Sequence, residues 1–375
     1  MAILSIFYKH KEGGFTRRLY SLYRALAQEG HDLYYLSSEE LPVIHQHIKP
    51  CLVSSPLTGK GNKPFWLYFI FGSLLASYRI TKKHHVRTIV NFGPFYTFLC
   101  LVPIKLRRIP AITFVRADNM KHSRNAVRNL FFYGLDWAGI RISHKVVFNS
   151  HTLIKTYQAR YGIPEDKIHF IPNNITGRYS ISQEAKQDIR QSMGVHSREF
   201  LVSTAGVFNP GKNFSYLIEA MEALHRYGIK LLIIGDEVVP NGERIRLKNL
   251  THRLGLDRSV IFCGWQSDPS ALVASSDAFV FPSRFEGSPN ALLEALGCGV
   301  ACLGARIDEI AEVLHYEELL FPLDHHEVLV GKIKRLRFDA AFRRRVAILS
   351  QKRCEHFLFD WEQEVLKIID QDGGR

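Results

Sequence analysis

Short apolar runs alternate with amphipathic stretches along the chain, and this alternation predicts repeated strand and helix units. The first apolar run, residues 2–8, predicts a buried strand, and the next stretch predicts a helix that ends at Gly30. One face of that helix carries Leu19, Leu22, Tyr23 and Leu26. The other strands of the first half are expected at residues 33–36, 88–90, 111–115 and 146–149. Alternating strands and helices form a mostly parallel sheet with helices on both faces.

The pattern pauses near residue 172 and restarts near residue 200. Strands are expected at residues 200–204, 230–234, 260–263, 278–282 and 300–303. Helices are expected at residues 214–226, 243–254, 270–274, 290–296 and 355–369. We therefore predict an α/β protein with two doubly wound domains, residues 1–172 and residues 173–354. A cleft is expected between the carboxyl ends of the two sheets, where ligands of open α/β folds bind.

Positive charge is concentrated in the first half of the chain. Of the 49 basic and 36 acidic residues, residues 1–150 hold 21 basic and 7 acidic ones, whereas residues 151–375 hold 28 and 29. This asymmetry predicts an anionic partner for the first domain: a membrane surface, a polyphosphate or a nucleic acid. No motif or interleaved aromatic and basic platform favours a nucleic acid, so we expect none as a partner.

Two uncharged apolar stretches, residues 64–78 and 88–104, have basic residues at both ends. Neither reaches the roughly 20 residues that a membrane-spanning helix needs. Apolar patches with basic rims favour a peripheral position on an anionic bilayer. The alternative is that both stretches are core elements with solvated ends. Residues 2–8 lack the basic flank of a secretory signal, so we expect a cytoplasmic protein.

The stretch at residues 282–297 carries the strongest functional signal. An apolar strand ends at its start, a tight loop carries Glu286 and Gly287, and a helix follows. Gly287 or Ser288 is expected at the N-cap of this helix and Pro289 at its first position. The free N–H groups of a helix start favour a phosphate, and carboxylates accept hydrogen bonds from sugar hydroxyls. The alternative is an ordinary helix with surface glutamates.

The spacing of Glu286 and Glu294 within Phe-Glu-Gly-Ser-Pro-Asn-Ala-Leu-Leu-Glu-Ala resembles the E-x7-E motif of glycosyltransferase family 4. Its members are retaining enzymes with the two-domain GT-B fold. Four other segments resemble the family in order and spacing: residues 205–213, 233–236, 262–265 and 278–283. The resemblance implies two Rossmann-like domains that face a central cleft. It also implies that a C-terminal helix, residues 355–375, crosses back to the first domain.

The resemblance assigns roles to residues at matching positions. Glu286 would contact the donor sugar near the reaction centre, Glu294 would hold the ribose, and Lys212 would neutralise the diphosphate. A fixed cation at that position stabilises the charge of a leaving nucleoside diphosphate. The alternative for Lys212 is a solvated residue after a Pro-Gly turn. The other donor-binding residues implied are Gly13, Gly14, Gly206, Asn213, Gly235, Asp236, Gly264, Trp265, Gln266, Gly287, Ser288, Pro289, Asn290 and Ala291.

The sequence departs from the family pattern at two places. The arginine that commonly follows the glycine matching Gly206 is replaced by Val207, so Arg284 is a possible substitute. The His-Asp pair that many members place near the reacting sugar is also absent. Arg116 and Asp118 stand there instead and are candidate catalytic residues. The alternative is an ion pair at the end of a strand.

No metal or other cofactor is expected. The one Asp-x-Asp triplet, residues 370–372, lies in the polar C-terminal tail, where a solvated helix end is the simpler interpretation. Cys298 and Cys302 are four residues apart, but no second pair of ligands accompanies them. The six cysteines are scattered, as is typical of buried free thiols in a reducing compartment.

Together, these features predict a hexosyltransferase that acts with retention on a UDP- or GDP-sugar. The expected acceptor is a hydroxyl of an envelope glycan or of a lipid-linked oligosaccharide, as in lipopolysaccharide, capsule or exopolysaccharide assembly. The expected location is the cytoplasmic face of the cell membrane. Two alternatives remain open: a catalytically weak GT-B homologue that acts as a membrane-surface partner, and a sugar-nucleotide epimerase or hydrolase.

Overall fold

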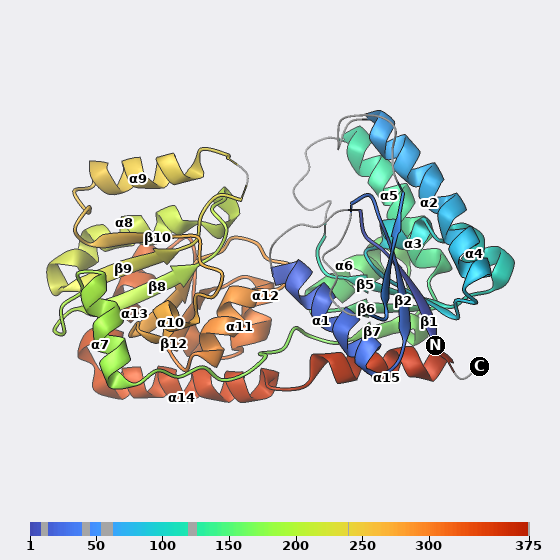
Figure 1. Cartoon of the computed structure of the whole chain (residues 1–375). Helices are drawn as coiled ribbons and strands as arrows, with labels where there is room; N and C mark the ends of the chain where they lie inside the picture. The colour runs from blue at the N-terminus through green and yellow to red at the C-terminus, as the bar shows by residue number, and fades with distance from the viewer. Residues whose placement is uncertain (9–13, 40–45, 54–62, 119–125, 239, 374–375) are drawn as a thin grey trace. The chain divides into compact units, whose positions relative to one another are not determined.

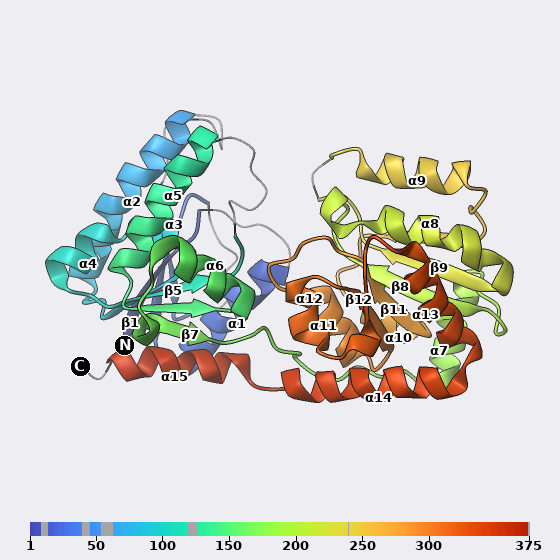
Figure 2. The ribbon, with the colours of Figure 1, turned by 180° about the vertical axis from the view of Figure 1, so that it is seen from behind.

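The computed structural model describes residues 1–8, 14–39, 46–53, 63–118, 126–238 and 240–373, and these form two compact units (Figure 1). The first unit combines Met1–Pro172 with Asp360–Arg375, and the second is Asn173–Phe359. Each unit contains one parallel sheet with helices on both of its faces (Figures 1 and 2).

The sheet of the first unit has seven strands in the order β3-β2-β1-β4-β5-β6-β7. The strands are β1 (Ala2–Ile6), β2 (Asp32–Ser37), β3 (Ile48–Leu52), β4 (Thr88–Phe92), β5 (Ala111–Val115), β6 (Lys145–Phe148) and β7 (Ile168–Phe170). Every residue of β4 and β5 is buried, as expected for central strands with helices on both faces. The five predicted strands of this half are confirmed. The two edge strands, β3 and β7, were not predicted, because their partly exposed residues form no continuous apolar run.

Seven helices accompany this sheet in the described part of the chain. They are α1 (Gly14–Gln28), α2 (Lys63–Lys83), α3 (Pro94–Phe98), α4 (Leu101–Arg107), α5 (Ala126–Ile142), α6 (His151–Tyr161) and α15 (Trp361–Gly373). The predicted apolar face of α1 is confirmed, since Leu19, Leu22, Tyr23 and Leu26 are fully buried. Helix α15 packs beside α1, with Trp361 buried between helix and sheet (Figure 1).

The sheet of the second unit has six strands in the order β10-β9-β8-β11-β12-β13. They are β8 (Phe200–Ala205), β9 (Ile229–Ile234), β10 (Val260–Gly264), β11 (Ala278–Phe281), β12 (Ala301–Ala305) and β13 (Leu320–Phe321). The helices are α7 (Gln183–Ser192), α8 (Phe214–Leu224), α9 (Glu243–Arg253), α10 (Ser270–Ala274), α11 (Asn290–Gly297), α12 (Asp308–Leu314), α13 (His326–Phe338) and α14 (Ala340–Phe357). Short 3-10 turns occur at Glu165–Lys167, Pro210–Lys212, His225–Tyr227 and Glu317–Leu319. All five strands predicted for this half are confirmed.

The expected single helix at residues 355–369 is wrong. Helix α14 ends at Phe357, and a new helix, α15, begins at Trp361. Asp360 starts the second helix, because its side chain accepts a hydrogen bond of 2.9 Å from the backbone N–H of Gln363. The segment that returns to the first unit therefore begins at Asp360 rather than at residue 355.

The two apolar stretches with basic ends differ in how far their side chains are buried. Residues 88–104 form β4, α3 and the start of α4, and most of their side chains are buried, so the expected surface patch there is wrong. Residues 64–78 lie within α2, which buries Phe65 and Phe69 but exposes Leu67, Phe71 and Leu75. Among the described helices, none is both long and apolar enough to cross a membrane.

The close packing of α5 on α3 yields a stability prediction. A Cβ atom at Gly139 would lie 2.0 Å from the backbone oxygen of Pro94. Gly139→Ala must therefore push the two helices apart, and we expect it to lower the free energy of unfolding by about 1–3 kcal/mol or more. Gly134→Ala in the same helix meets nothing within 4 Å and should raise it by about 0.5–1 kcal/mol. Urea unfolding of both variants tests this, and effects of equal sign would contradict it.

Candidate functional site

The order of strands in the second sheet places a ligand site at the carboxyl ends of β8 and β11. The chain runs from β8 outward to β9 and β10, then returns to β11 on the other side of β8. At such a switch point the two outgoing loops diverge and leave room for a ligand. The loops at residues 206–213 and 282–289 follow these two strands, so their side chains meet at one edge of the sheet.

An ion pair joins these two loops. The Lys212 Nζ atom lies 2.6 Å from Glu286 Oε1 and 5.1 Å from the ring centre of Phe281. Only 8% of the Glu286 side chain and 20% of the Lys212 side chain are exposed. Because little water screens this pair, its charges act more strongly on a bound ligand than surface charges would. Lys212 and Glu286, two residues expected at the donor site, thus lie in contact.

The loop that carries Lys212 is held by its neighbours on both sides. The side chain of Asn209 accepts hydrogen bonds from the N–H groups of Gly211 and Lys212, at 2.9 and 3.2 Å. Asn213 adopts a left-handed conformation, and its buried amide donates to the Pro282 carbonyl at 3.2 Å. The Asn213 side chain therefore ties the two loops together, which makes it a positioning residue.

Three glycines follow or end the neighbouring strands β8, β9 and β10. Gly206, Gly235 and Gly264 have φ angles of 156°, 136° and 69°, a region that favours glycine. A Cβ atom at Gly235 would lie 1.9 Å from the backbone oxygen of Gly206. The backbone of these loops thus approaches so closely that a side chain would separate them, and the loops present backbone atoms at this edge.

The other predicted donor residues at this edge either bind neighbouring protein groups or are exposed to solvent. Asp236 forms a two-point ion pair with Arg244 of α9, which sequence reasoning missed. Trp265 is 45% exposed, and Gln266 donates to the Cys263 carbonyl at 3.1 Å. Arg284, the suggested substitute for the arginine replaced by Val207, is exposed, and its backbone N–H donates to Gly211 at 2.9 Å.

The start of α11 differs from the prediction. The helix begins at Asn290, with Pro289 at the N-cap in a non-helical conformation. Ser288 does not cap the helix, because its hydroxyl accepts a hydrogen bond of 2.7 Å from Asn173, which also donates to Asn290 at 2.6 Å. The predicted N-cap at Gly287 or Ser288 and the predicted first position for Pro289 are therefore wrong. In the described part of the chain, no side chain caps this helix, and Glu294 is exposed further along it.

Arg116 and Asp118 of the first unit have different neighbours. Arg160 of α6 binds Asp118 at two points, 2.9 and 2.7 Å, so an ion pair does form beyond the end of β5, but with Arg160, which the sequence did not suggest. Arg116 instead lies over the ring of Trp361 at 6.0 Å, and Arg18 lies over the same ring at 5.1 Å. Burial and the charge of Arg18 lower the pKa of Arg116 to about 9, so its guanidinium remains charged at neutral pH.

Two glycines of the expected donor site lie at the start of the first unit. Gly14 is the first residue of α1, and Gly13 lies outside the described residues.

Sequence reasoning missed Asp136, the lone acid of α5. Its side chain is buried, with 4% of the residue exposed. Burial, with a smaller effect of Asp118, raises the pKa of its carboxyl to about 7, although Arg160 opposes this shift. A single acidic residue within the apolar run of residues 126–142 was the signal that could have identified it.

The described residues contain no group of three or more His, Cys, Asp or Glu side chains that could hold a metal ion. All six cysteines are free, and four of them are buried. The Asp-x-Asp triplet lies near the end of α15. The absence of a metal requirement stays a prediction.

Comparison with protein families identifies the chain. Residues 185–353 match the model described as Glycosyl transferases group 1, and residues 12–176 match the model described as Glycosyltransferase Family 4. The two models together cover most of both units. The chain belongs to the GT-B glycosyltransferases. The predicted family, GT-B fold and class of hexosyltransferase are confirmed.

Individual glycosyltransferases are similar to this chain in sequence, and a solved structure is similar to it in fold. N-acetyl-alpha-D-glucosaminyl L-malate synthase of Bacillus anthracis is 23% identical over 367 residues, which are 93% of this chain and 92% of that protein. The UDP-Gal:alpha-D-GlcNAc-diphosphoundecaprenol alpha-1,3-galactosyltransferase of Escherichia coli is 32% identical over 243 residues, 63% of this chain and 62% of the relative. The Anabaena protein HepE, solved with UDP and glucose, has the same fold, with a TM-score of 0.78 and 19% identity over 98% of this chain and 99% of HepE.

The geometry of the ion pair yields a prediction for the binding of a nucleoside diphosphate. Lys212→Met should weaken the affinity for UDP or GDP by about 10- to 100-fold, since charge-assisted hydrogen bonds contribute about 1.5–3 kcal/mol. Lys230→Met is the matched control, because Lys230 is 15% exposed and pairs with Glu199 at the amino end of β9. Calorimetric titration of both variants measures the affinities. Equal affinities would show that another cation holds the phosphates.

The buried carboxyl of Asp136 predicts a pH dependence of stability. Its folded pKa of about 7 lies above the ordinary value of 3.8, so the folded state holds a proton that the unfolded state releases. The stability from this group is therefore lost as the pH rises from about 4 to about 7. The free energy of unfolding of Asp136→Asn, measured relative to that of the wild type, should therefore increase from pH 5 to pH 8. Urea unfolding at both pH values measures this, with the exposed Asp166→Asn as a control that should show no such trend.

Proposed function

We propose that this GT-B glycosyltransferase moves a hexosyl unit from a UDP- or GDP-sugar to a hydroxyl of a lipid-linked or envelope glycan, with retention of anomeric configuration. The observation that carries the proposal is the Lys212–Glu286 pair at the switch point of the second sheet. Retention and the nucleoside diphosphate donor come from the resemblance to family 4 and its E-x7-E motif.

The ion pair suits the charges that develop during glycosyl transfer. As the bond to the diphosphate breaks, negative charge grows on the leaving group and positive charge on the anomeric carbon. Lys212 would release Glu286 and bind the diphosphate, whose charge it would stabilise. Glu286 would then accept hydrogen bonds from the sugar hydroxyls and stabilise the positive charge of the sugar. Both charges come from the protein, so the proposal requires no metal.

The acceptor is proposed from the relatives and from the surface of the first unit. The Escherichia coli relative is named for a diphosphoundecaprenol acceptor, a lipid-linked glycan. Helix α2 exposes Leu67, Phe71 and Leu75, contains no acidic residue and ends with Lys82 and Lys83. Exposed apolar residues beside cations suit a peripheral position on the cytoplasmic face of an anionic membrane, where each nearby cation contributes about 1 kcal/mol.

The substitution Glu286→Gln tests the proposed role of the ion pair. Purified protein is assayed with a chelator present, with labelled UDP- and GDP-hexoses and with lipid-linked acceptors, and NMR gives the anomeric configuration of the product. We expect transfer by the variant to fall by about 100-fold or more. Its affinity for UDP or GDP should be unchanged or higher, because the neutral amide no longer competes for Lys212.

A matched control separates the catalytic effect from loss of a buried carboxylate. Glu199→Gln removes the carboxylate that pairs with Lys230 and should leave transfer unchanged. Wild-type transfer by Glu286→Gln would overturn the role given to Glu286. Donor turnover without an acceptor would indicate a hydrolase or epimerase, and donor binding without turnover would indicate a catalytically weak homologue.

A further inference from the structure

A cavity of about 510 Å³ lies in the first unit, at the carboxyl edge of its sheet. Its walls are mostly aromatic and aliphatic side chains, including Trp66 and Ile70 of α2, Phe95 of α3 and Phe131 of α5. Phe92, the last residue of β4, also lines it. The strand order runs outward from β1 to β2 and β3 and then resumes with β4 on the other side of β1. This cavity therefore adjoins the topological switch point between β1 and β4, where ligands of such folds bind. Its volume falls within the roughly 300–1,000 Å³ of typical ligand sites.

One acidic side chain faces this apolar space. Asp136 is the single charged residue among the described residues that line the cavity. The described part of the chain shows no hydrogen bond or ion pair to its carboxyl, and the nearby cation, Arg160, is held at two points by Asp118. A buried carboxyl in such surroundings is costly to the folded state unless a ligand supplies a polar partner. A pure hydrocarbon would leave it unsatisfied, so the cavity suits an amphiphile.

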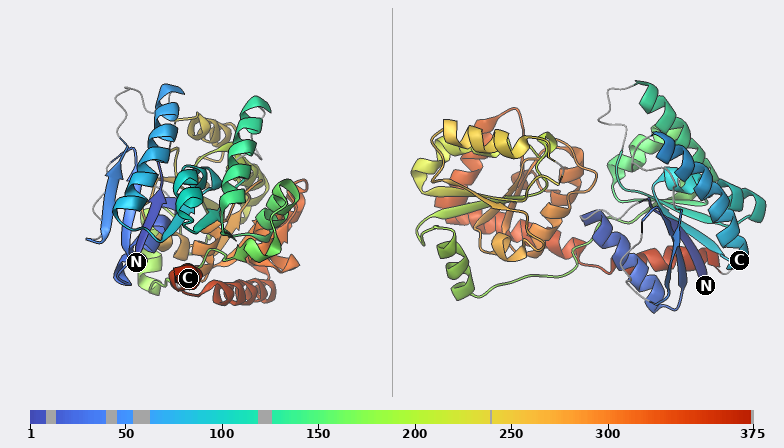
Figure 3. Two further views of the ribbon diagram at one scale, coloured as in Figure 1. Left: turned by 90° about the vertical axis from the view of Figure 1, so that its right-hand side faces the viewer. Right: turned by 45° about the horizontal axis from the view of Figure 1, so that its top comes forward.

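The apolar wall of the cavity continues to the protein surface. Leu67 and Phe131 both line it, yet they are 59% and 56% exposed. Helices α2 and α5, which carry these residues, are two long helices on the same side of the first sheet (Figures 1 and 3). Leu67 and Phe131 therefore form an apolar rim at the opening of the cavity.

We infer that the cavity between α2, α3 and α5 binds the hydrocarbon chain of a lipid-linked acceptor, with Asp136 bound to its first polar group. This inference rests on the proposed function, which supplies an acceptor at the membrane surface. When the Asp136 carboxyl is protonated, it can donate a hydrogen bond to an oxygen of that polar group. Among the described residues, the titratable groups that interact with Asp136 are Asp118, Arg160, Tyr157 and Tyr161.

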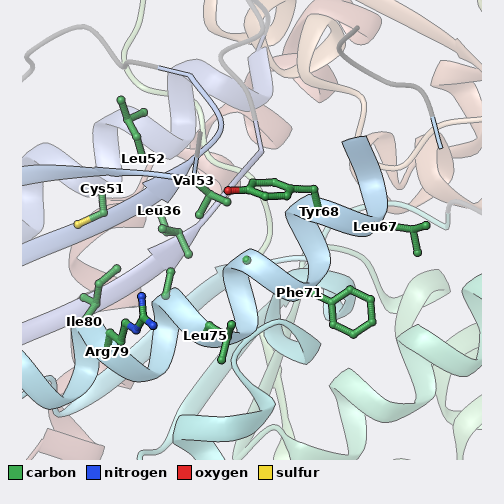
Figure 4. Close-up of a pocket in the computed structure, with 12 residues that line it drawn as sticks. Leu36, Cys51, Leu52, Val53, Leu67, Tyr68, Phe71, Leu75, Arg79 and Ile80 are labelled. Carbon is green, nitrogen blue, oxygen red and sulfur yellow. The ribbon is translucent and has the colours of Figure 1, made fainter. Parts of the chain in front are cut away.

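A second apolar groove, on another side of α2, provides the comparison. Figure 4 shows this larger groove of about 930 Å³, in which Tyr68 points toward Val53. Phe71 projects from α2 away from the strands. Its charged lining residue, Arg79, is exposed to solvent. The described residues that line this groove include no carboxyl, so the hydrocarbon chain is assigned to the cavity beside α5.

Binding of farnesyl phosphate to the full chain tests the inference by calorimetry. We expect saturable binding with which inorganic phosphate does not compete. Phe131→Ala and Asp136→Ala should each weaken the affinity by at least fivefold. Leu130→Ala should change it by less than twofold, because Leu130 is 73% exposed on the same helix but does not line the cavity. Equal losses for Phe131→Ala and Leu130→Ala, or no binding by the wild-type chain, would overturn the inference.

A second measurement tests whether the bound hydrocarbon chain belongs to a lipid-linked acceptor or to a membrane lipid. Short-chain phosphatidylglycerol should bind more weakly than farnesyl phosphate, and the reverse order would assign the cavity to a membrane lipid and overturn the inference. In the transfer assay, Phe131→Ala should raise KM for an acceptor with an isoprenoid chain but leave the kinetics with its methyl glycoside unchanged. Loss of all transfer by the wild-type chain would refute the proposed function alone, since farnesyl phosphate binding is measured without a donor.

Discussion

The Lys212–Glu286 ion pair depends on one topological constraint, the adjacency of β8 and β11 in a parallel sheet. Because both strands end at the same edge, the loops that follow them meet there although they are far apart in sequence. Asn213 fixes their separation through its hydrogen bond to Pro282. The result is a cation and a carboxylate 2.6 Å apart and mostly shielded from water. One charge of each sign suits the charges that develop when the bond of a glycosyl phosphate breaks, as we propose here.

The same topology recurs in the first unit with different chemistry. The strand order of its sheet also reverses beside a central strand, β1. The described residues around the space at that edge form aromatic walls and include one buried carboxyl, that of Asp136. The exposed apolar residues of α2 and α5 extend this surface. The first half of the chain also holds all of the net positive charge, because the second half has 28 basic and 29 acidic residues. A charged site in one unit and an apolar cavity in the other fit the two substrates that we propose, a water-soluble donor and an amphiphilic acceptor.

Local sequence patterns predicted the strands and the first helix because these elements are defined by contiguous apolar residues. They failed where a contact with a distant residue decides the local conformation. Ser288 was expected to cap α11, but Asn173 engages its hydroxyl. The apolar run at residues 88–104 could form a surface patch or a core, and it is buried by the pairing of β4 with β1 and β5 and by the packing of α3 against α5. The edge strands β3 and β7 depend on pairing with β2 and β6 rather than on their own composition.

The sequence by itself determined the alternation of elements, the family to which its motifs belong and the loops that carry polar residues. These properties follow from residues that are neighbours along the chain. Only the tertiary structure decided which charged groups meet: Lys212 with Glu286, Asp236 with Arg244, and Asp118 with Arg160. It also decided that Asp136 is buried beside a cavity. The physical reason is that strand order and helix packing set the distances between residues far apart in sequence, and no local periodicity encodes those distances.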